Sequence, residues 1–194
     1  MTRNLRCLAV LTLGLSVLSA RAPQPGKDPS REAAPAQPPA APQPPARAEL
    51  TAGEAATPEA LTASLYAFIS GPAGQKRDAA RIRALFHPTA RILVAGRHPE
   101  KGPFLRAIEL EPFLAFVLPQ WEQGFFEQAT ATTVQRWEGV AQVWSPYAIR
   151  RSAEGPVAYT GVNALQCAWD GKRWWITHLA FESAPAAAPG GALR

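Results

Sequence analysis

Cysteine is nearly absent from this chain of 194 residues, which has only Cys7 and Cys167. Cys7 belongs to an N-terminal segment that we expect to be removed, and its loss leaves Cys167 without an intrachain disulfide partner. Cys167 stands in the alternating stretch "GVNALQCAW", where a buried strand thiol is more common than a nucleophile. The scarcity of cysteine therefore argues against a disulfide-stapled domain and against a cysteine enzyme.

Long apolar runs are also scarce, and the longest lies at the N-terminus. Arg3 and Arg6 give the chain a basic start before the apolar run "CLAVLTLGLSVLS". This run is followed by an A-x-A pattern that ends at Ala22. A run of about 13 residues suits a secretory signal peptide and is shorter than the roughly 20 residues that span a membrane. We predict a signal peptide at residues 1–22, no further membrane span, and a periplasmic or secreted protein. Because Pro23 disfavours cleavage directly before it, the alternatives are cleavage a few residues away and a membrane tether formed by an uncleaved segment.

Aromatic residues are missing from residues 23–56, which are rich in Pro, Ala and Gln. Such a segment cannot bury enough apolar surface to offset its ordering entropy, so we interpret it as a disordered Pro/Ala-rich linker. A short tail at residues 185–194 has the same character. The folded part is therefore expected at residues 57–184, the length of one domain.

Clustered charge and metal-ligand spacing are absent as well. The net charge is +5, but the basic residues are scattered, so we expect no nucleic-acid partner. The three histidines are His87, His98 and His178, and they do not stand at the spacings of metal ligands. We predict no metal and no cofactor.

The domain contains three stretches with helical spacing of apolar residues. N-cap, proline and glycine signals bound predicted helices at residues 58–70, 76–86 and 110–124, the last interrupted by Pro119. His87 follows the second helix and precedes a proline, so it is expected to cap the last carbonyls of that helix. His98 lies in a polar loop and is expected to be solvated.

The remaining segments alternate and are rich in Val, Thr and aromatic residues. We predict a strand over residues 90–98, then four consecutive strands over residues 125–137, 140–151, 157–169 and 173–181. Asp170-Gly171 is a tight hairpin signal before the last strand. Helices followed by an antiparallel meander predict an α+β domain with a curved sheet wrapped over its helices.

The faces of the last predicted strand decide the role of its histidine. Strict alternation places Trp174 and His178 on one face, and Trp175 and Leu179 on the other. Each face thus carries a tryptophan, so both are expected to be covered. A bulge near Ser145, two strands earlier, would change which side chains face inward, so the inward face stays open at this point.

The order of these elements, with "RIRALFHPTARI", "GVAQVWSPY", "GVNALQ" and "DGKRWWI", resembles the NTF2-like (SnoaL-like) superfamily. The resemblance covers nearly all of residues 57–183. It implies a cone in which N-terminal helices pack in a strongly curved, mostly antiparallel sheet, with a pocket at the mouth. It says less about activity, because the superfamily includes isomerases, dehydratases, hydrolases and non-catalytic binding or assembly domains.

The resemblance supplies only part of an isomerase site. Ketosteroid isomerase-like members use a tyrosine on the first helix and a carboxylate on the first strand. Tyr66 matches the tyrosine, but Val94 stands at about the position of the carboxylate, and Thr89 stands where the family often has Asp. The glutamates lie mostly in turns, helices or polar strand positions, so a proton-abstracting base is missing. The remaining catalytic candidates are Tyr66 and His178, although a strand histidine is more often structural.

The expected cone brings aromatic and polar residues towards one apolar pocket: Tyr66, Trp121, Tyr147, Asn163 and His178. The alternative is that these side chains simply form the core. Our first interpretation is a domain that binds a small apolar molecule or a protein partner without catalysis. The alternatives are a small-molecule isomerase, dehydratase or hydrolase, and a homodimer formed through the outer sheet face, which carries Trp137 and Trp144.

Overall fold

The computed structural model describes residues 44–186, so the predicted signal peptide and most of the predicted linker and tail lie outside the described residues. The elements in chain order are α1 (Pro58–Ile69), α2 (Ala79–Leu85), β1 (Phe86–His98), β2 (Gly102–Glu109), α3 (Leu110–Trp121), β3 (Phe126–Ala129), β4 (Thr133–Trp137), β5 (Val140–Arg150), β6 (Val157–Trp169) and β7 (Trp174–Pro185). Among these residues no helix has the length and hydropathy that a membrane crossing requires.

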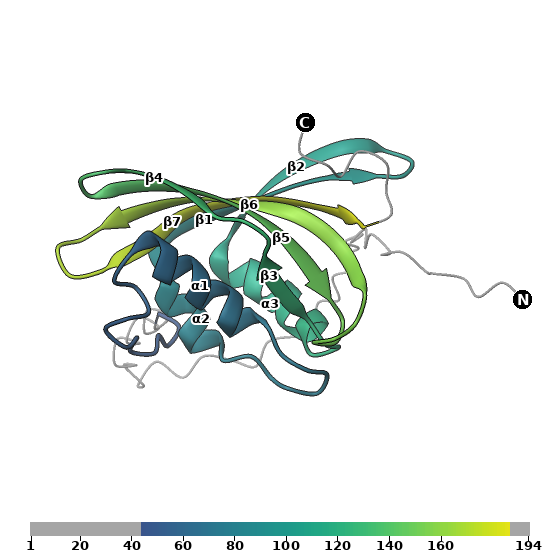
Figure 1. The fold of residues 1–194 in the computed structure, drawn as a ribbon, viewed down its shortest axis with the longest axis horizontal. Coiled ribbons are helices and arrows are strands. Elements are labelled where there is room, and N and C mark those ends of the chain that lie inside the picture. Colours follow the sequence, from purple (N-terminus) through teal and green to yellow (C-terminus); the bar gives the residue numbers. More distant parts are fainter. Residues whose placement is uncertain (1–43, 187–194) are drawn as a thin grey trace, which may run out of the picture. The chain divides into compact units, whose positions relative to one another are not determined.

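The seven strands form one sheet in the order β2-β1-β7-β6-β5-β3, with β4 pairing to β5 beside β3. All neighbours are antiparallel except β1 and β7, which run parallel. The sheet is strongly bent, and the three helices lie on its concave side (Figure 1). The prediction of an α+β domain with a curved, mostly antiparallel sheet over helices is confirmed.

Helices α1 and α2 begin where side-chain caps are available. Thr57 Oγ1 accepts a hydrogen bond from the N–H of Ala60 at 3.1 Å, and Pro58 occupies the first helical position of α1. Asp78 Oδ1 caps α2 in the same way, by accepting from two backbone N–H groups. The apolar faces of the helices then meet the concave face of the sheet in one core, whose fully enclosed side chains include Leu61, Ile82, Leu85, Phe86, Ile92, Leu114, Val143, Leu165, Trp174 and Ile176.

Several element boundaries differ from the sequence prediction. Helix α2 ends at Leu85, and His87 already belongs to β1, so His87 does not cap the helix. Its Nδ1 lies 2.8 Å from Thr89 Oγ1, and its ring packs edge-on against Trp175. Helix α3 continues through Pro119. The missing N–H of that proline leaves one carbonyl of the preceding turn unpaired, and this turn is partly exposed, so water is available to the carbonyl.

Two strands also depart from the prediction. No sequence pattern indicates β2, because this edge strand is mostly exposed on both faces and lacks a buried alternation. The predicted strand over residues 125–137 is two strands, β3 and β4, which lie along the same edge of β5. The chain turns at Thr130, whose N–H donates to the carbonyl of Pro146 at 2.8 Å.

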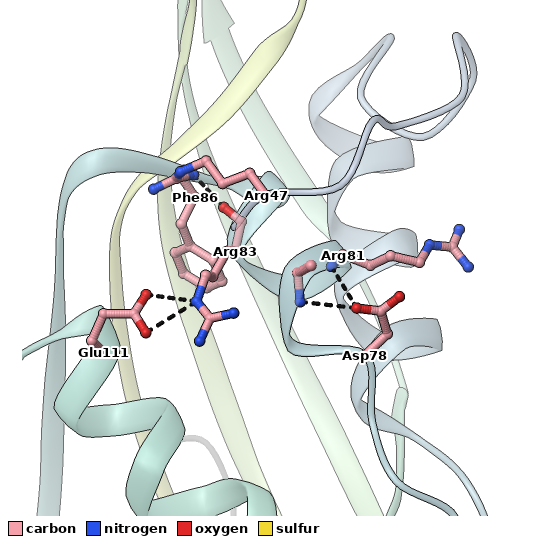
Figure 2. Close-up of polar contacts among 7 residues, drawn as sticks. Arg47, Asp78, Arg81, Arg83, Phe86 and Glu111 are labelled. Carbon is pink, nitrogen blue, oxygen red and sulfur yellow. Dashed lines mark hydrogen bonds and ion pairs between the residues drawn. The ribbon is translucent and has the colours of Figure 1, made fainter. Parts of the chain in front are cut away.

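The last part of the predicted linker packs on the domain. Arg47 donates to the carbonyls of Arg83 and Phe86 at the end of α2, the second at 2.5 Å (Figure 2). Further along, Glu54 forms an ion pair with Arg81, and Ala55 is 3% exposed and accepts a hydrogen bond from the N–H of Trp174. Residues 44–56, which we call the strap, therefore belong to the packed domain, which begins earlier than the predicted boundary at residue 57.

The strap meets α2 at the point where the helix exposes its free carbonyls. Arg173, from the turn before β7, donates to the Ala84 carbonyl at 2.5 Å, so two arginines perform the capping that the sequence assigned to His87. Arg83 in turn binds Glu111 of α3 through Nε at 2.8 Å (Figure 2). The end of α2 thus joins the strap, the sheet and α3.

Candidate functional site

A bulge in β7 determines which of its side chains face the helices. Gln166 of β6 is opposite His178, whereas the next residue of β6, Cys167, is opposite Ile176, so Thr177 is an extra residue in β7. The alternation is therefore reversed after Ile176. Leu179, not His178, faces the core and is 5% exposed.

His178 consequently lies on the outer face of the sheet, the convex face that points away from the helices. Its neighbours across the adjacent strands are Gln166 and Arg91, and both of these side chains are exposed. The bulge near Ser145 that the sequence left open does not occur, since β5 and β6 pair without a shift through that position. The structure thus separates His178 from the other four predicted pocket residues.

Tyr66 and Asn163 do come together on the concave side. Ser145 and Asn163 face each other across β5 and β6, and both are buried. The phenol oxygen of Tyr66, from α1, lies 2.7 Å from Ser145 Oγ and 3.2 Å from Asn163 Nδ2. Burial raises the pKa of Tyr66, although its hydrogen bonds with Ser145 and Asn163 act against the rise, so the phenol keeps its proton at neutral pH.

A carboxyl group completes this cluster, and it comes from Glu127 on β3. Asn163 Nδ2 donates to Glu127 Oε1 at 2.8 Å. Burial raises the pKa of Glu127 to about 7, and the hydrogen bond from Asn163 only partly opposes this rise. We call Tyr66, Glu127, Ser145 and Asn163 the polar cluster.

The donors and acceptors of the polar cluster determine which group donates in each of its hydrogen bonds. The two hydrogens of the Asn163 amide go to Glu127 and to Tyr66, so the Tyr66 hydroxyl directs its own hydrogen to Ser145. Ser145 Oγ can then donate to the carbonyl of Ala131 at 3.4 Å. Within residues 44–186, Oε2 of Glu127 has no hydrogen-bond partner, and no side-chain N or O atom is both buried and unpartnered. The described residues therefore leave one carboxyl oxygen free to bind a further group.

Tyr147 lies beside the polar cluster. It is 2% exposed, and its hydroxyl donates to the carbonyl of Glu182 at 3.3 Å. Burial is the main cause that raises the pKa of Tyr147, and the nearby charge of Glu127 adds to it. The ring crosses β6 at Gly161, where an added Cβ would lie 2.5 Å from the ring and 2.3 Å from the Glu182 carbonyl oxygen. Only glycine leaves room for this crossing.

Aromatic side chains flank the polar cluster on the side of α3. Phe113 packs edge-on against Phe181 and Trp121, with ring centroids 5.9 and 6.4 Å apart, and Trp121 lies 5.5 Å from Phe125. Phe181 is the β7 neighbour of Asn163. Trp121 therefore contributes an apolar wall rather than a polar contact.

The core is less enclosed near α3 than at α1 and α2. Half-buried apolar side chains gather there from β1, β2, α3, the segment before β3, and β7: Val94, Ile108, Val117, Leu118, Phe125 and Phe181. Val94, the residue at the expected carboxylate position, is thus part of this apolar surface beside Phe181. The carboxyl of the cluster comes from β3 instead.

Glu127 was missed by the sequence reasoning, which concluded that no base was available. A signal for it existed in the stretch "FFEQA": Phe125 and Ala129 are apolar residues packed against the core, and Glu127 lies between them at a spacing of two. A single acidic residue on the apolar side of a strand is a candidate for a shifted pKa. Among the described residues no three His, Cys, Asp or Glu side chains gather into a group that could hold a metal ion.

Solved structures resemble this fold. No family model and no curated protein matches the chain. A protein of unknown function with a cystatin-like fold from Nostoc punctiforme aligns with a TM-score of 0.51 at 15% identity, over 65% of this chain and 87% of that one. An NTF2-like protein with a cystatin-like fold from Novosphingobium aromaticivorans aligns with a TM-score of 0.47 at 12% identity, over 68% and 81%. At this identity the similarity concerns the fold alone. The described residues therefore form an α+β domain with an NTF2-like fold, a curved sheet over three helices.

Proposed function

We propose that the concave side of the sheet binds a small, mostly apolar molecule that carries one polar group. The observation that supports this most strongly is the Glu127 carboxyl, which Asn163 holds through one oxygen while the other oxygen has no partner within residues 44–186. The half-buried apolar side chains near α3 supply a surface for the rest of the molecule. A mostly apolar site with a few convergent polar groups is typical of small-molecule binding.

Proton transfer is the second candidate function, and the pKa of Glu127 favours it. A carboxyl whose pKa is about 7 is divided between acid and base forms at neutral pH, as general acid–base catalysis requires. Glu127 would supply the base that the sequence analysis did not find, and Tyr66 would hold the amide that orients it. An isomerase or dehydratase would therefore use Glu127 as its acid–base group. His178 is less suited to that role, because it lies on the outer face.

One experiment tests binding and separates it from catalysis. Protein purified from its natural host is extracted with organic solvent, and the released compounds are identified by mass spectrometry. We expect a specific compound from the wild type and from His178→Gln, and a reduced amount from Glu127→Gln. Equal amounts from all three proteins, or none from the wild type, would contradict the proposal. Incubation of the compound with protein in D₂O then distinguishes the candidates, because only proton transfer gives deuterium uptake that depends on Glu127.

The outer face also carries a candidate protein interface, and we propose a second copy of the chain as its partner. Trp137, Val140 and Trp144 lie on this face and are 81%, 59% and 41% exposed. Sedimentation should give a dimer that Trp144→Glu converts to a monomer. Phe116→Glu is the matched control, because Phe116 is exposed on α3. A monomeric wild type would end this proposal.

A further inference from the structure

Ser70 links the end of α1 to the backbone of Glu127. It is the C-cap residue of α1, and its N–H donates to the carbonyl of Tyr66 at 3.1 Å. Its hydroxyl accepts a hydrogen bond from the N–H of Glu127 at 3.0 Å and donates to the carbonyl of the same residue at 3.2 Å. One hydroxyl therefore satisfies both backbone groups of Glu127 on this side.

This contact occurs where β3 has no neighbouring strand. β3 is four residues long and pairs with β5 alone, with Glu127 opposite Ile149. On its other side, Gly71 and Phe125 exchange backbone hydrogen bonds of 2.7 and 3.1 Å just before β3 begins. Ser70 and Gly71 thus replace a strand neighbour along the part of the chain that carries the carboxyl.

A buried arginine fixes the residues on both sides of Ser70. Arg77 is 8% exposed, and its guanidinium donates to the carbonyl of Ile69 at 2.8 Å and to that of Gly71 at 2.6 Å. It also donates to the Trp121 carbonyl at the end of α3, at 3.1 Å. The ends of two helices are therefore held at one point, and Ser70 has little freedom to move relative to them.

Tyr66 and Ser70 are four residues apart, one turn along the same side of the chain. Tyr66 reaches the amide of Asn163, Asn163 holds the carboxyl of Glu127, and the backbone of Glu127 returns to Ser70. These four residues close a ring of hydrogen bonds. We propose that Ser70 is a positioning residue for the Glu127 carboxyl, and that α1 sets the separation of this carboxyl from Tyr66 through it.

This inference rests on the proposed function of Glu127, and it predicts a specific effect of the Ser70 hydroxyl. Without the hydroxyl, the edge of β3 must bind water, and the carboxyl becomes better solvated. Solvation favours the ionised form, so the pKa of Glu127 should fall. A loss of stability alone would not change this value in a folded protein, and the titration therefore separates positioning from a structural role.

The test is an NMR titration of the Glu127 side-chain carboxyl carbon in the full chain, assigned by comparison with Glu127→Gln. We expect a value near 7 in the wild type and a fall of about 1 pH unit or more in Ser70→Ala. Ser70→Thr keeps the hydroxyl and should restore the wild-type value. The matched control is Ser64→Ala, since Ser64 is also in α1 and donates to the carbonyl of Glu54 at 3.0 Å, away from β3.

The outcomes distinguish this inference from the proposed function. If the pKa of Glu127 is near 7 in the wild type and has the same value in folded Ser70→Ala, the positioning role is wrong. An equal fall in Ser64→Ala would also overturn it, because the effect would then be general. A wild-type value near 4.5 would instead remove the basis of the proton-transfer function of Glu127. Should Ser70→Ala fail to fold, Ser70→Cys carries the same test, because a thiol is a weaker donor and acceptor.

Discussion

The amide nitrogen of Asn163 lies 2.8 Å from the carboxyl of Glu127, and this contact joins two strands that are not adjacent in the sheet. β5 runs between them and supplies Ser145 to the same cluster. The same amide nitrogen also donates to Tyr66. The Asn163 side chain, from β6, therefore links α1 with β3, the strand on the other side of β5. The chemistry of the site therefore depends on the bend of the sheet, which brings β3 close to β6.

The pKa of Glu127 predicts how stability depends on pH. In the folded chain it is raised to about 7 from an ordinary value of 4.5, so the folded state holds a proton that the unfolded state releases between these values. The free energy of unfolding should fall as pH rises from 4.5 to 7, by on the order of 3 kcal/mol from this group. Urea unfolding of the wild type and Glu127→Gln across this range measures the difference. A difference that stays constant with pH would contradict the prediction.

Placement of His178 on the outer face predicts a small effect of its replacement. His178→Gln should change the free energy of unfolding by no more than about 0.5 kcal/mol and should leave ligand retention unchanged. Asn163→Ala is the contrasting variant, because it leaves Tyr66 and Glu127 without their shared donor and should cost about 1 to 3 kcal/mol. Loss of ligand retention in His178→Gln would place the functional site elsewhere.

The crossing of Tyr147 over β6 predicts a strong effect at Gly161. An added Cβ there would lie 2.3 Å from a backbone oxygen and 2.5 Å from the tyrosine ring, so Gly161→Ala must displace β7 or the ring. We expect a cost of about 1 to 3 kcal/mol in thermal or urea unfolding. Gly53→Ala is the control, because nothing lies within 4 Å of the place that its methyl group would occupy in the strap. Equal stability of the two variants would contradict the described crossing.

The strap predicts that a chain beginning at Thr57 is less stable than one beginning at Pro44. The shorter chain loses the hydrogen bonds of Arg47 and the ion pair of Glu54, and it uncovers Trp174 where Ala55 binds. Several hydrogen bonds at about 1 kcal/mol each should lower Tm by roughly 10 °C. Differential scanning calorimetry of both chains provides the measurement. Equal Tm values would mean that the strap contributes nothing to stability.

The sequence was sufficient for most of the fold because the relevant signals are local. Thr57 and Pro58 start a helix through their own backbone and side-chain preferences, and Asp170-Gly171 forms a turn irrespective of what surrounds it. The edge strand β2 has no buried face, so no periodic pattern existed to reveal it. Local preferences and periodicity therefore explain both why the helix and the turn were predicted and why β2 was not.

The site was harder to predict because it depends on register. Tyr66, Tyr147 and Asn163 were named as candidate pocket residues while the inward face of the strands was left open, and the structure places them around Glu127. Glu127 was overlooked because the glutamates were assigned mostly to turns, helices or polar strand positions, although this one stands between Phe125 and Ala129, which pack against the core. The reversal at Thr177 lies in the pairing of β6 with β7, and a single strand's sequence does not contain that information.

The extra residue at Thr177 decides which of two neighbouring side chains reaches the protein interior. Because the bulge takes up one residue, a chain without Thr177 would keep Ile176 and Leu179 inside and His178 outside, now with regular pairing. The present chain paired without the bulge would instead turn His178 inward and Leu179 outward. The bulge therefore keeps an imidazole out of the core without any change of side chain.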